Sequence, residues 1–347
     1  MTPQDAASVA PSTPAPSPGA LPAPPRLAAK GIVLTGASSG IGRATALAMA
    51  SEGAALVLAA RDEAALQGLV RECEALGGRA TAVPTDVTDP EAVAALARRA
   101  LEVLGQVDVW INNVGVGAVG RFDETPVAAH RRVVEANLLG HIHGAHAILG
   151  AMRQRGRGTL INMISIGGWI PTPYAAAYSA SKFGLRGFSE ALRGELVDLP
   201  GVHVCEVYPT FVDSPGLSHG ANYSGRQVGA PPPLIDPRRV ARVLVALSAS
   251  ERPRAKTYMG APALPGMFAH ALAPDLLARA MGHVMRRALA GAGPALAADG
   301  NLFQSSRTHE VDGGFRRQRR PFAAPGGYVL LGLMAAGAAW ALRPRRA

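Results

Sequence analysis

The chain has 347 residues, of which 48% are hydrophobic and 17% charged, and its formal net charge is +10. The hydrophobic fraction is large enough for a folded core, which excludes a wholly disordered protein. Two cysteines, Cys73 and Cys205, are too few for a disulfide scaffold or a cysteine-ligated metal site, so we expect two buried thiols in a protein of a reduced compartment.

The composition divides the chain into four parts. Residues 1–27 are rich in proline and alanine and predict a disordered leader, without the basic start or the unbroken apolar run of a secretory signal. Residues 28–260 are expected to form one domain and residues 261–320 an irregular, partly helical extension. Residues 321–347 form a hydrophobic segment flanked by arginines.

Short apolar runs alternate with helix-like stretches from Lys30 onward. The expected strands are residues 32–34, 54–60, 79–84, 107–111, 158–164, 202–208 and 255–259. The expected helices are residues 43–52, a stretch ending near 76, and residues 89–104, 128–153, 174–199, 237–248 and 271–290. This alternation predicts a parallel sheet covered on both faces, which is a doubly wound, Rossmann-type α/β domain, here with a C-terminal helical extension.

A glycine-rich turn joins the first expected strand to the first expected helix. Its glycines permit a tight turn and a close approach of the backbone to phosphate, and the N–H groups at the helix start face that phosphate. In this context the turn is typical of dinucleotide binding, with a purely structural tight turn as the alternative. The residues expected to contact the cofactor here are Gly36, Ser38, Ser39, Gly40, Ile41 and Gly42.

Arg61 follows the second expected strand, at the position that selects the cofactor. An acidic residue there would bind the adenosine ribose hydroxyls and repel a 2′-phosphate, whereas a guanidinium suits a phosphate. Asp62 comes one residue later and is expected to cap the next helix. We therefore expect NADP(H) rather than NAD(H).

Asp86, after the third strand, would bond the adenine amino group or serve only as a turn or capping residue.

Four further residues point to proton transfer. Tyr178 and Lys182 lie four residues apart on an expected helix and share a face. The unperturbed pKa of tyrosine is about 10, and a neighbouring ammonium is expected to lower it. Ser165 follows the fifth strand, where open parallel sheets bind ligands, and its hydroxyl would orient a substrate oxygen. Asn137, within an expected helix, would hold a water that links Lys182 to solvent, unless it only marks a kink.

Together these residues resemble the short-chain dehydrogenase/reductase family over about residues 30–260. The glycine-rich turn matches the family's TGxxxGIG motif, and residues 112–115 match its NNAG motif with Val114 in place of alanine. Pro209 and Thr210 stand where the family often has Pro-Gly. The family's catalytic tetrad is matched by Asn137, Ser165, Tyr178 and Lys182.

The resemblance implies hydride transfer between a nicotinamide and a carbonyl or alcohol carbon, without a metal. Tyr178 would donate the proton in reduction and accept it in oxidation. The further cofactor contacts expected on this basis are Val87, Asn113, Gly115, Tyr178, Lys182, Pro209 and Thr210.

Two features outside these motifs have simpler explanations. The spacing of His141, His143 and His146 does not bring all three to one metal ion, so no metal site is expected. The loop over residues 211–230 is where the family closes over its substrate. Apolar side chains in this loop and after Ser165 suggest an apolar pocket, with ordinary loop packing as the alternative: Phe211, Leu217, Tyr223, Trp169 and Ile170.

The C-terminal part carries most of the positive charge. Residues 250–347 hold 14 basic and 5 acidic side chains, whereas residues 1–249 hold 21 basic and 20 acidic side chains. Residues 322–342 are uncharged and would span about 31 Å as a helix, close to the thickness of a bilayer core. Arginines on both sides favour a membrane over nucleic acid. We expect a cytoplasmic protein that is membrane-associated through this segment as a transmembrane or interfacial helix, with packing on a partner subunit as the alternative.

The sequence thus predicts an NADP(H)-dependent oxidoreductase acting on a carbonyl or secondary alcohol of an apolar small molecule. Two alternatives are open. One is an oxidoreductase on a small polar substrate, whose tail serves only for location. The other is a dinucleotide-binding regulatory protein with little turnover. A homo-oligomer is left open as an assembly, and nucleic acid is not an expected partner.

Overall fold

The computed structural model describes residues 26–28, 30–229, 233–260, 263–306 and 308–316. Nearly all of the predicted leader and the whole of residues 322–342 lie outside the described residues, and with them the predicted membrane segment. Within the part that is described, no helix is both long and apolar enough to cross a bilayer.

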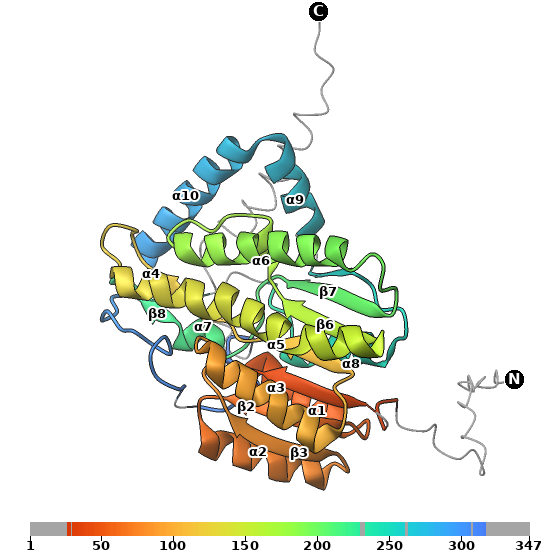
Figure 1. The fold of residues 1–347 in the computed structure, drawn as a ribbon. Helices are drawn as coiled ribbons and strands as arrows, with labels where there is room; N and C mark the ends of the chain where they lie inside the picture. Colours follow the sequence, from red (N-terminus) through yellow and green to blue (C-terminus); the bar gives the residue numbers. More distant parts are fainter. Residues whose placement is uncertain (1–25, 29, 230–232, 261–262, 307, 317–347) are drawn as a thin grey trace, which may run out of the picture.

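In the described part of the chain, seven parallel strands form the central sheet in the order β3-β2-β1-β4-β6-β7-β9 (Figure 1). The strand predictions are confirmed. The order reverses between β1 and β4, and a doubly wound sheet binds its ligand in the crevice at the carboxyl ends of such strands. The strands are β1 (Gly31–Thr35), β2 (Ala55–Ala60), β3 (Arg79–Pro84), β4 (Val109–Asn112), β6 (Gly158–Met163), β7 (Val202–Pro209) and β9 (Lys256–Met259).

Helices cover both faces of this sheet, as the buried apolar strands require (Figure 1). On one face α1 packs against α2 and α8 over Leu34 and Leu58. On the other face α3, α5 and α6 cover Val33, Trp110 and Leu160. These helices are α1 (Gly40–Ala50), α2 (Glu63–Ala75), α3 (Pro90–Leu104), α5 (Gly140–Arg155), α6 (Ala176–Glu195) and α8 (Pro237–Ala249).

Aspartates start three of the helices, whereas α1 starts differently. Asp62, Asp89 and Asp236 each accept a hydrogen bond from a backbone N–H in the first turn of α2, α3 and α8. The predicted capping role of Asp62 is confirmed. The side chain of Ser39, at the start of α1, makes no such bond. The start of α1 is therefore an N–H-rich site without a side-chain cap, which suits an anion.

Two helical stretches are more complex than the sequence indicates. The stretch predicted over 128–153 consists of α4 (Val127–Val134), a π-helical turn η1 (Glu135–Leu139) and α5. In the extension, α9 (Ala263–Leu272) precedes α10 (Pro274–Gly291), and the two form a hairpin above α6 (Figure 1). Pro274 separates them, because a proline inside a helix lacks the N–H that the helix needs.

Short elements tie the loops after β4 and β7 together. β5 (Ala118–Val119) pairs in parallel with β8 (Ala221–Asn222), next to the short helix α7 (Gly216–His219). Two-residue strands have no alternation of polar and apolar residues, so the sequence pattern does not predict them. The pairing joins two rims of the crevice at the carboxyl edge of the sheet.

Both cysteines are buried, as predicted. Cys73 lies on α2 and Cys205 on β7. Burial raises the pKa of each thiol to about 12. The two thiols therefore stay protonated at neutral pH and behave as small apolar side chains.

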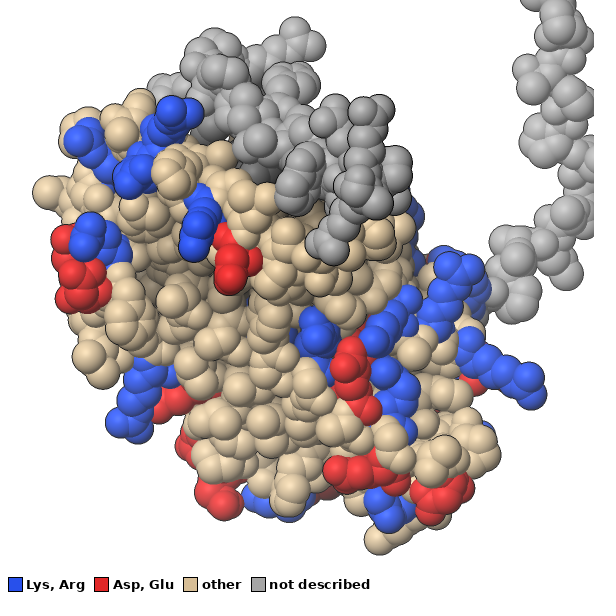
Figure 2. All heavy atoms as spheres, turned by 90° about the horizontal axis from the view of Figure 1, so that it is seen from above, with Lys and Arg blue, Asp and Glu red and all other residues tan. Residues whose placement is uncertain are grey.

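Charged side chains lie along the left, right and lower parts of the described surface seen from above, with a broad uncharged area among them (Figure 2). The view from above looks down on the hairpin of α9 and α10, which is at the top of the molecule in Figure 1. The hairpin exposes four large apolar side chains, Leu264, Phe268, Leu272 and Leu276. The extension therefore presents an apolar surface to solvent.

Candidate active site

The glycine-rich turn between β1 and α1 leaves no room for a side chain at Gly42. A Cβ there would lie 2.0 Å from the carbonyl oxygen of Gly36, and Gly36 itself has a φ of +66°. Asn113, which follows β4, donates from Nδ2 to this carbonyl oxygen at 3.1 Å and to the Thr35 carbonyl oxygen at 3.2 Å. Asn113 therefore holds the turn in a form that lets a diphosphate approach the backbone and the start of α1.

Arg61 lies at the end of β2, on the side of the crevice predicted for the adenosine. Its guanidinium donates to three backbone carbonyl oxygens of the C-terminal extension, at 2.7 Å to Asn301, 3.1 Å to Leu302 and 2.7 Å to Gln304. The sequence places Arg61 at this strand end but does not indicate that the extension returns to it. The guanidinium predicted to hold a phosphate is thus already hydrogen-bonded within the chain.

Asp86, after β3, forms an ion pair that the sequence does not predict. Its carboxylate accepts from Arg132 of α4 at 2.5 Å and from the Thr88 hydroxyl at 2.9 Å. Burial raises the pKa of Asp86, but the hydrogen bonds from Arg132 and Thr88 outweigh it, and the net shift is downward. Arg132 also donates to the Leu302 carbonyl oxygen at 3.0 Å. No sequence signal marks Arg132, because its role depends on a partner 46 residues away.

Ser165 has a φ of +136°, a conformation that is strained for any residue with a side chain. Its Oγ accepts a hydrogen bond from the Gly167 N–H at 3.1 Å, which helps to hold this conformation. The Ser165 and Tyr178 side chains flank the same glycine, since a Cβ added to Gly167 would lie 3.5 Å from Ser165 Oγ and 3.0 Å from Tyr178 Cε1. The two hydroxyl groups predicted to handle the substrate oxygen are therefore neighbours, and strain of this kind is typical of functional sites.

Lys182 is buried one turn further along α6, where its Nζ donates to the Met163 carbonyl oxygen at 2.9 Å. Gly115 lies beside the ammonium, since a Cβ added there would be in van der Waals contact with this Nζ at 3.9 Å. Burial lowers the pKa of Lys182 to about 7. A lysine side chain whose pKa lies so close to neutral pH can take up or release a proton at physiological pH.

The structure contradicts the expectation that Lys182 lowers the pKa of Tyr178. Burial raises the pKa of Tyr178, and the nearby Ser165 hydroxyl only partly opposes the rise. The prediction of a lowered tyrosine pKa is wrong for the protein without ligand, because loss of water around the phenolate dominates. The tyrosine hydroxyl is therefore protonated at neutral pH.

Asn137 lies in the π-helical turn and is fully buried. Its Oδ1 accepts from the Val116 N–H and its Nδ2 donates to the Val116 carbonyl oxygen, both at 2.8 Å. Nδ2 also lies 3.3 Å from the Ser181 Oγ. The amide thus fastens the loop after β4 against α6, and π-helical turns are common at functional sites. The water-holding role of Asn137 stays a prediction.

The other predicted cofactor contacts lie at strand ends of the same edge. Val87 follows β3, and its carbonyl oxygen is 3.0 Å from His143 Nδ1. Pro209 ends β7, and the Thr210 N–H donates to the Met259 carbonyl oxygen at 3.0 Å. These residues occupy positions that suit the predicted role.

The three histidines of α5 do not form a cluster. His141 Nε2 lies 2.9 Å from the Val114 carbonyl oxygen, whereas His143 faces Val87. Burial, with a smaller contribution from Lys182, lowers the pKa of His141 to about 3. Within the described ranges, no group of three His, Cys, Asp or Glu side chains is placed to hold a metal ion.

The apolar pocket suggested by the sequence stays a prediction, although two of its aromatic residues have other contacts. The ring of Trp169 packs against Tyr208 and Tyr258 and under the Arg186 guanidinium, which lies 3.9 Å from the ring centre. The Tyr223 hydroxyl donates to Asp299 at 2.6 Å. For these two aromatic residues the alternative, ordinary packing, describes the structure.

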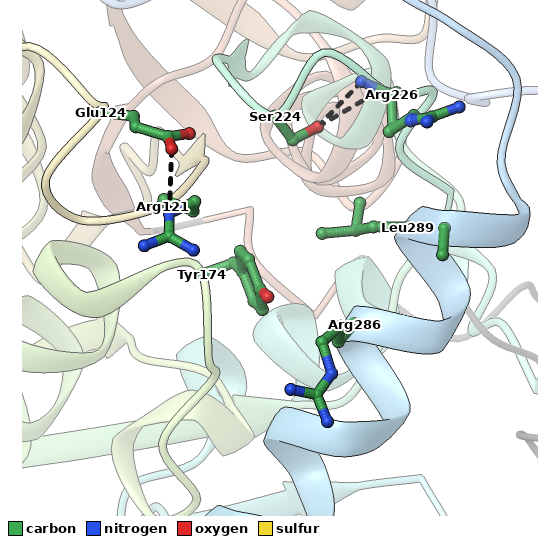
Figure 3. A pocket seen from close by; sticks show the side chains of 8 residues that line it. Arg121, Glu124, Tyr174, Ser224, Arg226, Arg286 and Leu289 are labelled. Carbon is green, nitrogen blue, oxygen red and sulfur yellow. Dashed lines mark hydrogen bonds and ion pairs between the residues drawn. The ribbon is translucent and has the colours of Figure 1, made fainter.

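A cavity of about 200 Å³ opens beside the turn that leads into α6 (Figure 3). Tyr174, on this turn, lies four residues before Tyr178 in the chain. Arg121 and Glu124 pair at 3.0 Å on the same side of the cavity as Tyr174, and Arg286 and Leu289 of α10 lie opposite (Figure 3). The lining combines charged, polar and apolar side chains and consists of Arg121, Glu124, Tyr174, Ser224, Arg226, Arg286, Leu289 and Ala290.

Comparison with known proteins agrees with this geometry. A family model described as short chain dehydrogenase matches residues 30–221, more than half of the chain. The chain belongs to the short-chain dehydrogenase family. It is 35% identical over 257 residues to the uncharacterized oxidoreductase YxnA of Bacillus subtilis, which covers 73% of this chain and 72% of that protein. It is 33% identical over 219 residues to the ketoacyl reductase HetN of Nostoc sp., which covers 63% and 75%.

Solved short-chain dehydrogenases share the fold. One from Streptomyces avermitilis superimposes with a TM-score of 0.63 at 31% identity and covers 74% of this chain and 98% of that one. A metagenomic short-chain oxidoreductase in complex with NADP gives a TM-score of 0.57 at 31% identity and covers 68% and 100%. This short-chain dehydrogenase therefore has the fold of an oxidoreductase family that binds a nicotinamide cofactor.

The buried ammonium of Lys182 predicts a particular dependence of stability on pH. The folded pKa is about 7 against 10.5 for an unburied lysine, so between these values the unfolded chain binds more protons and stability rises with pH. We expect Lys182→Met to unfold at a higher denaturant concentration than the parent at pH 6. The difference in the free energy of unfolding should be on the order of a few kcal/mol at that pH and should narrow toward pH 10. Lys30→Met is the control for loss of a lysine, and a gap independent of pH would contradict the prediction.

Proposed function

We propose that this short-chain dehydrogenase is an NADP(H)-dependent oxidoreductase that transfers a hydride between the nicotinamide and a carbonyl or secondary alcohol carbon. The neighbouring side chains of Ser165 and Tyr178, with Lys182 buried one turn further along the helix of Tyr178, carry the proposal. Solved relatives in complex with NADP and with 5-hydroxy-NADP support the cofactor class.

The residues at the carboxyl edge of the sheet fit a dinucleotide. Because Gly36 and Gly42 have no side chains, a diphosphate can approach the backbone there. The start of α1 has no side-chain cap, and its N–H groups suit the same diphosphate. Arg61 would hold the 2′-phosphate through a charge-assisted fork. Gly115 lies beside the Lys182 ammonium and would contact the ribose of the cofactor.

When bound, the nicotinamide supplies or accepts the hydride. The Ser165 hydroxyl donates a hydrogen bond to the substrate oxygen and orients it, and the Tyr178 hydroxyl gives its proton to that oxygen as negative charge develops. Because burial raises the pKa of Tyr178, this hydroxyl carries its proton at neutral pH, which suits reduction. The Lys182 ammonium, fixed by the Met163 carbonyl, stabilises the phenolate that remains.

The substrate class divides into two candidates. Apolar residues in the substrate loop favour an apolar ketone, as the sequence predicts. The arginines that line the cavity beside α6, Arg121, Arg226 and Arg286, favour a polar or anionic carbonyl compound instead. Turnover of NADPH with ketones of graded chain length and with keto acids of matched size decides between the two.

Turnover in this assay should depend on Tyr178. We expect Tyr178→Phe to lower kcat by about a hundredfold or more, because loss of a general acid removes stabilisation present only in the transition state. The affinity for NADPH should stay nearly unchanged. Tyr258→Phe is the matched control, because Tyr258 packs on Tyr208 away from Ser165. A Tyr178→Phe enzyme with the turnover of the parent would remove Tyr178 from the mechanism.

Cofactor preference should depend on Arg61. We expect Arg61→Ala to lower the ratio of NADPH to NADH affinity by about tenfold or more, because a hydrogen bond to a charged group contributes about 1.5–3 kcal/mol and only NADPH has the 2′-phosphate. Arg71→Ala, on the exposed face of α2, is the control. Calorimetric titration with both cofactors measures the ratio, and equal affinity of the parent for both would contradict the preference.

A membrane contact of residues 322–342 is a separate proposal, supported by the apolar surface of α9 and α10. The full chain should sediment with membranes and resist extraction by high salt and by carbonate, whereas a chain that ends at Arg316 should stay in the supernatant. Release by salt alone would indicate attraction between arginines and anionic lipid, which salt screens. A full chain found only in the supernatant would contradict the proposal.

A further inference from the structure

The C-terminal extension returns to the crevice after α10, and we call its described residues within 301–316 the strap. Leu302 anchors one end of the strap. Its side chain is 1% exposed and belongs to a buried cluster with Val116 and Val133, against which Tyr178 also packs. The strap thus begins in contact with the catalytic half of the site.

The middle of the strap uses donors that the proposed cofactor needs. The Gly40 N–H, at the start of α1, donates to the Glu310 carbonyl oxygen at 2.9 Å. The Arg61 guanidinium donates to three strap carbonyl oxygens, Leu302 among them. An N–H bonded to a carbonyl oxygen of the chain is not free for a phosphate oxygen, so strap and dinucleotide compete for these groups.

The other end of the strap is fastened by charges. Asp213, which is 1% exposed and lies after β7, accepts from the N–H groups of Phe315 and Arg316 at 2.9 and 3.1 Å. The Arg316 side chain adds a 2.9 Å contact with Asp213, and Arg238 pairs with Asp312 at 2.8 Å. The strap is therefore held at both ends, and its middle crosses the phosphate-binding turn.

We propose that the strap occupies the dinucleotide crevice of the ligand-free protein and that the cofactor binds by displacing the strap from Arg61 and Gly40. This proposal rests on the proposed function, because it assigns the same donors to the cofactor. The apparent affinity for the cofactor is then the intrinsic affinity multiplied by the fraction of molecules in which the strap is open, so a docked strap weakens cofactor binding. The extension is thus an internal competitor of NADP(H).

The test weakens each end of the strap and leaves Arg61 and Gly40 in place. We expect Leu302→Ala to bind NADPH about tenfold more tightly than the parent in calorimetric titration, because truncation of a buried leucine destabilises the docked strap. Leu296→Ala is the matched control, since Leu296 is 91% exposed and lies just before the strap. Arg316→Ala weakens the opposite end without touching the buried cluster and should shift the affinity in the same direction.

A second readout follows the strap itself. Amide hydrogen exchange in residues 301–316 should become faster when NADPH is added to the parent protein. Slower exchange, together with weaker binding by both variants, would show that the strap covers bound cofactor, and would overturn the proposal. Equal affinity of the parent, both variants and the control would also overturn it and leave the proposed function standing. Failure of every protein to bind a nicotinamide cofactor would overturn both.

Discussion

The close approach of the α1 start to the carbonyl oxygen of Gly36 is the constraint on which the carboxyl edge of the sheet depends. Only a residue without a Cβ fits at Gly42, and Asn113 from the neighbouring strand end holds the Gly36 oxygen. This joins β1, α1 and β4 at the point where the strand order reverses. The ends of the other strands then line up along the same edge, which is why residues far apart in sequence meet there.

Burial governs the chemistry of the catalytic half. It lowers the pKa of Lys182 and raises that of Tyr178, so both groups lean toward their neutral forms in the protein without ligand. The strained backbone of Ser165 and the buried amide of Asn137 hold the surrounding loops.

The C-terminal extension adds a layer that the core of the family fold does not need. Its carbonyl groups satisfy the Arg61 guanidinium, and its charged end meets the buried Asp213. A buried carboxylate needs such partners, because an unpaired charge away from water is costly. The same contacts that stabilise the extension therefore place it across the crevice, and they link cofactor binding to the packing of the extension.

The sequence by itself determined the strands, most helices, the glycine-rich turn and the buried cysteines. These features are local: they follow from apolar periodicity, from capping aspartates such as Asp62 and from glycines at tight turns. Tertiary structure alone decided the ion pair of Arg132 with Asp86, the packing of Trp169 against Tyr208, and the contact of Arg61 with a segment about 240 residues away. It also reversed the expected direction of the Tyr178 pKa shift. Contacts between distant residues leave no periodic pattern in the chain, and a pKa depends on everything that excludes water from the group.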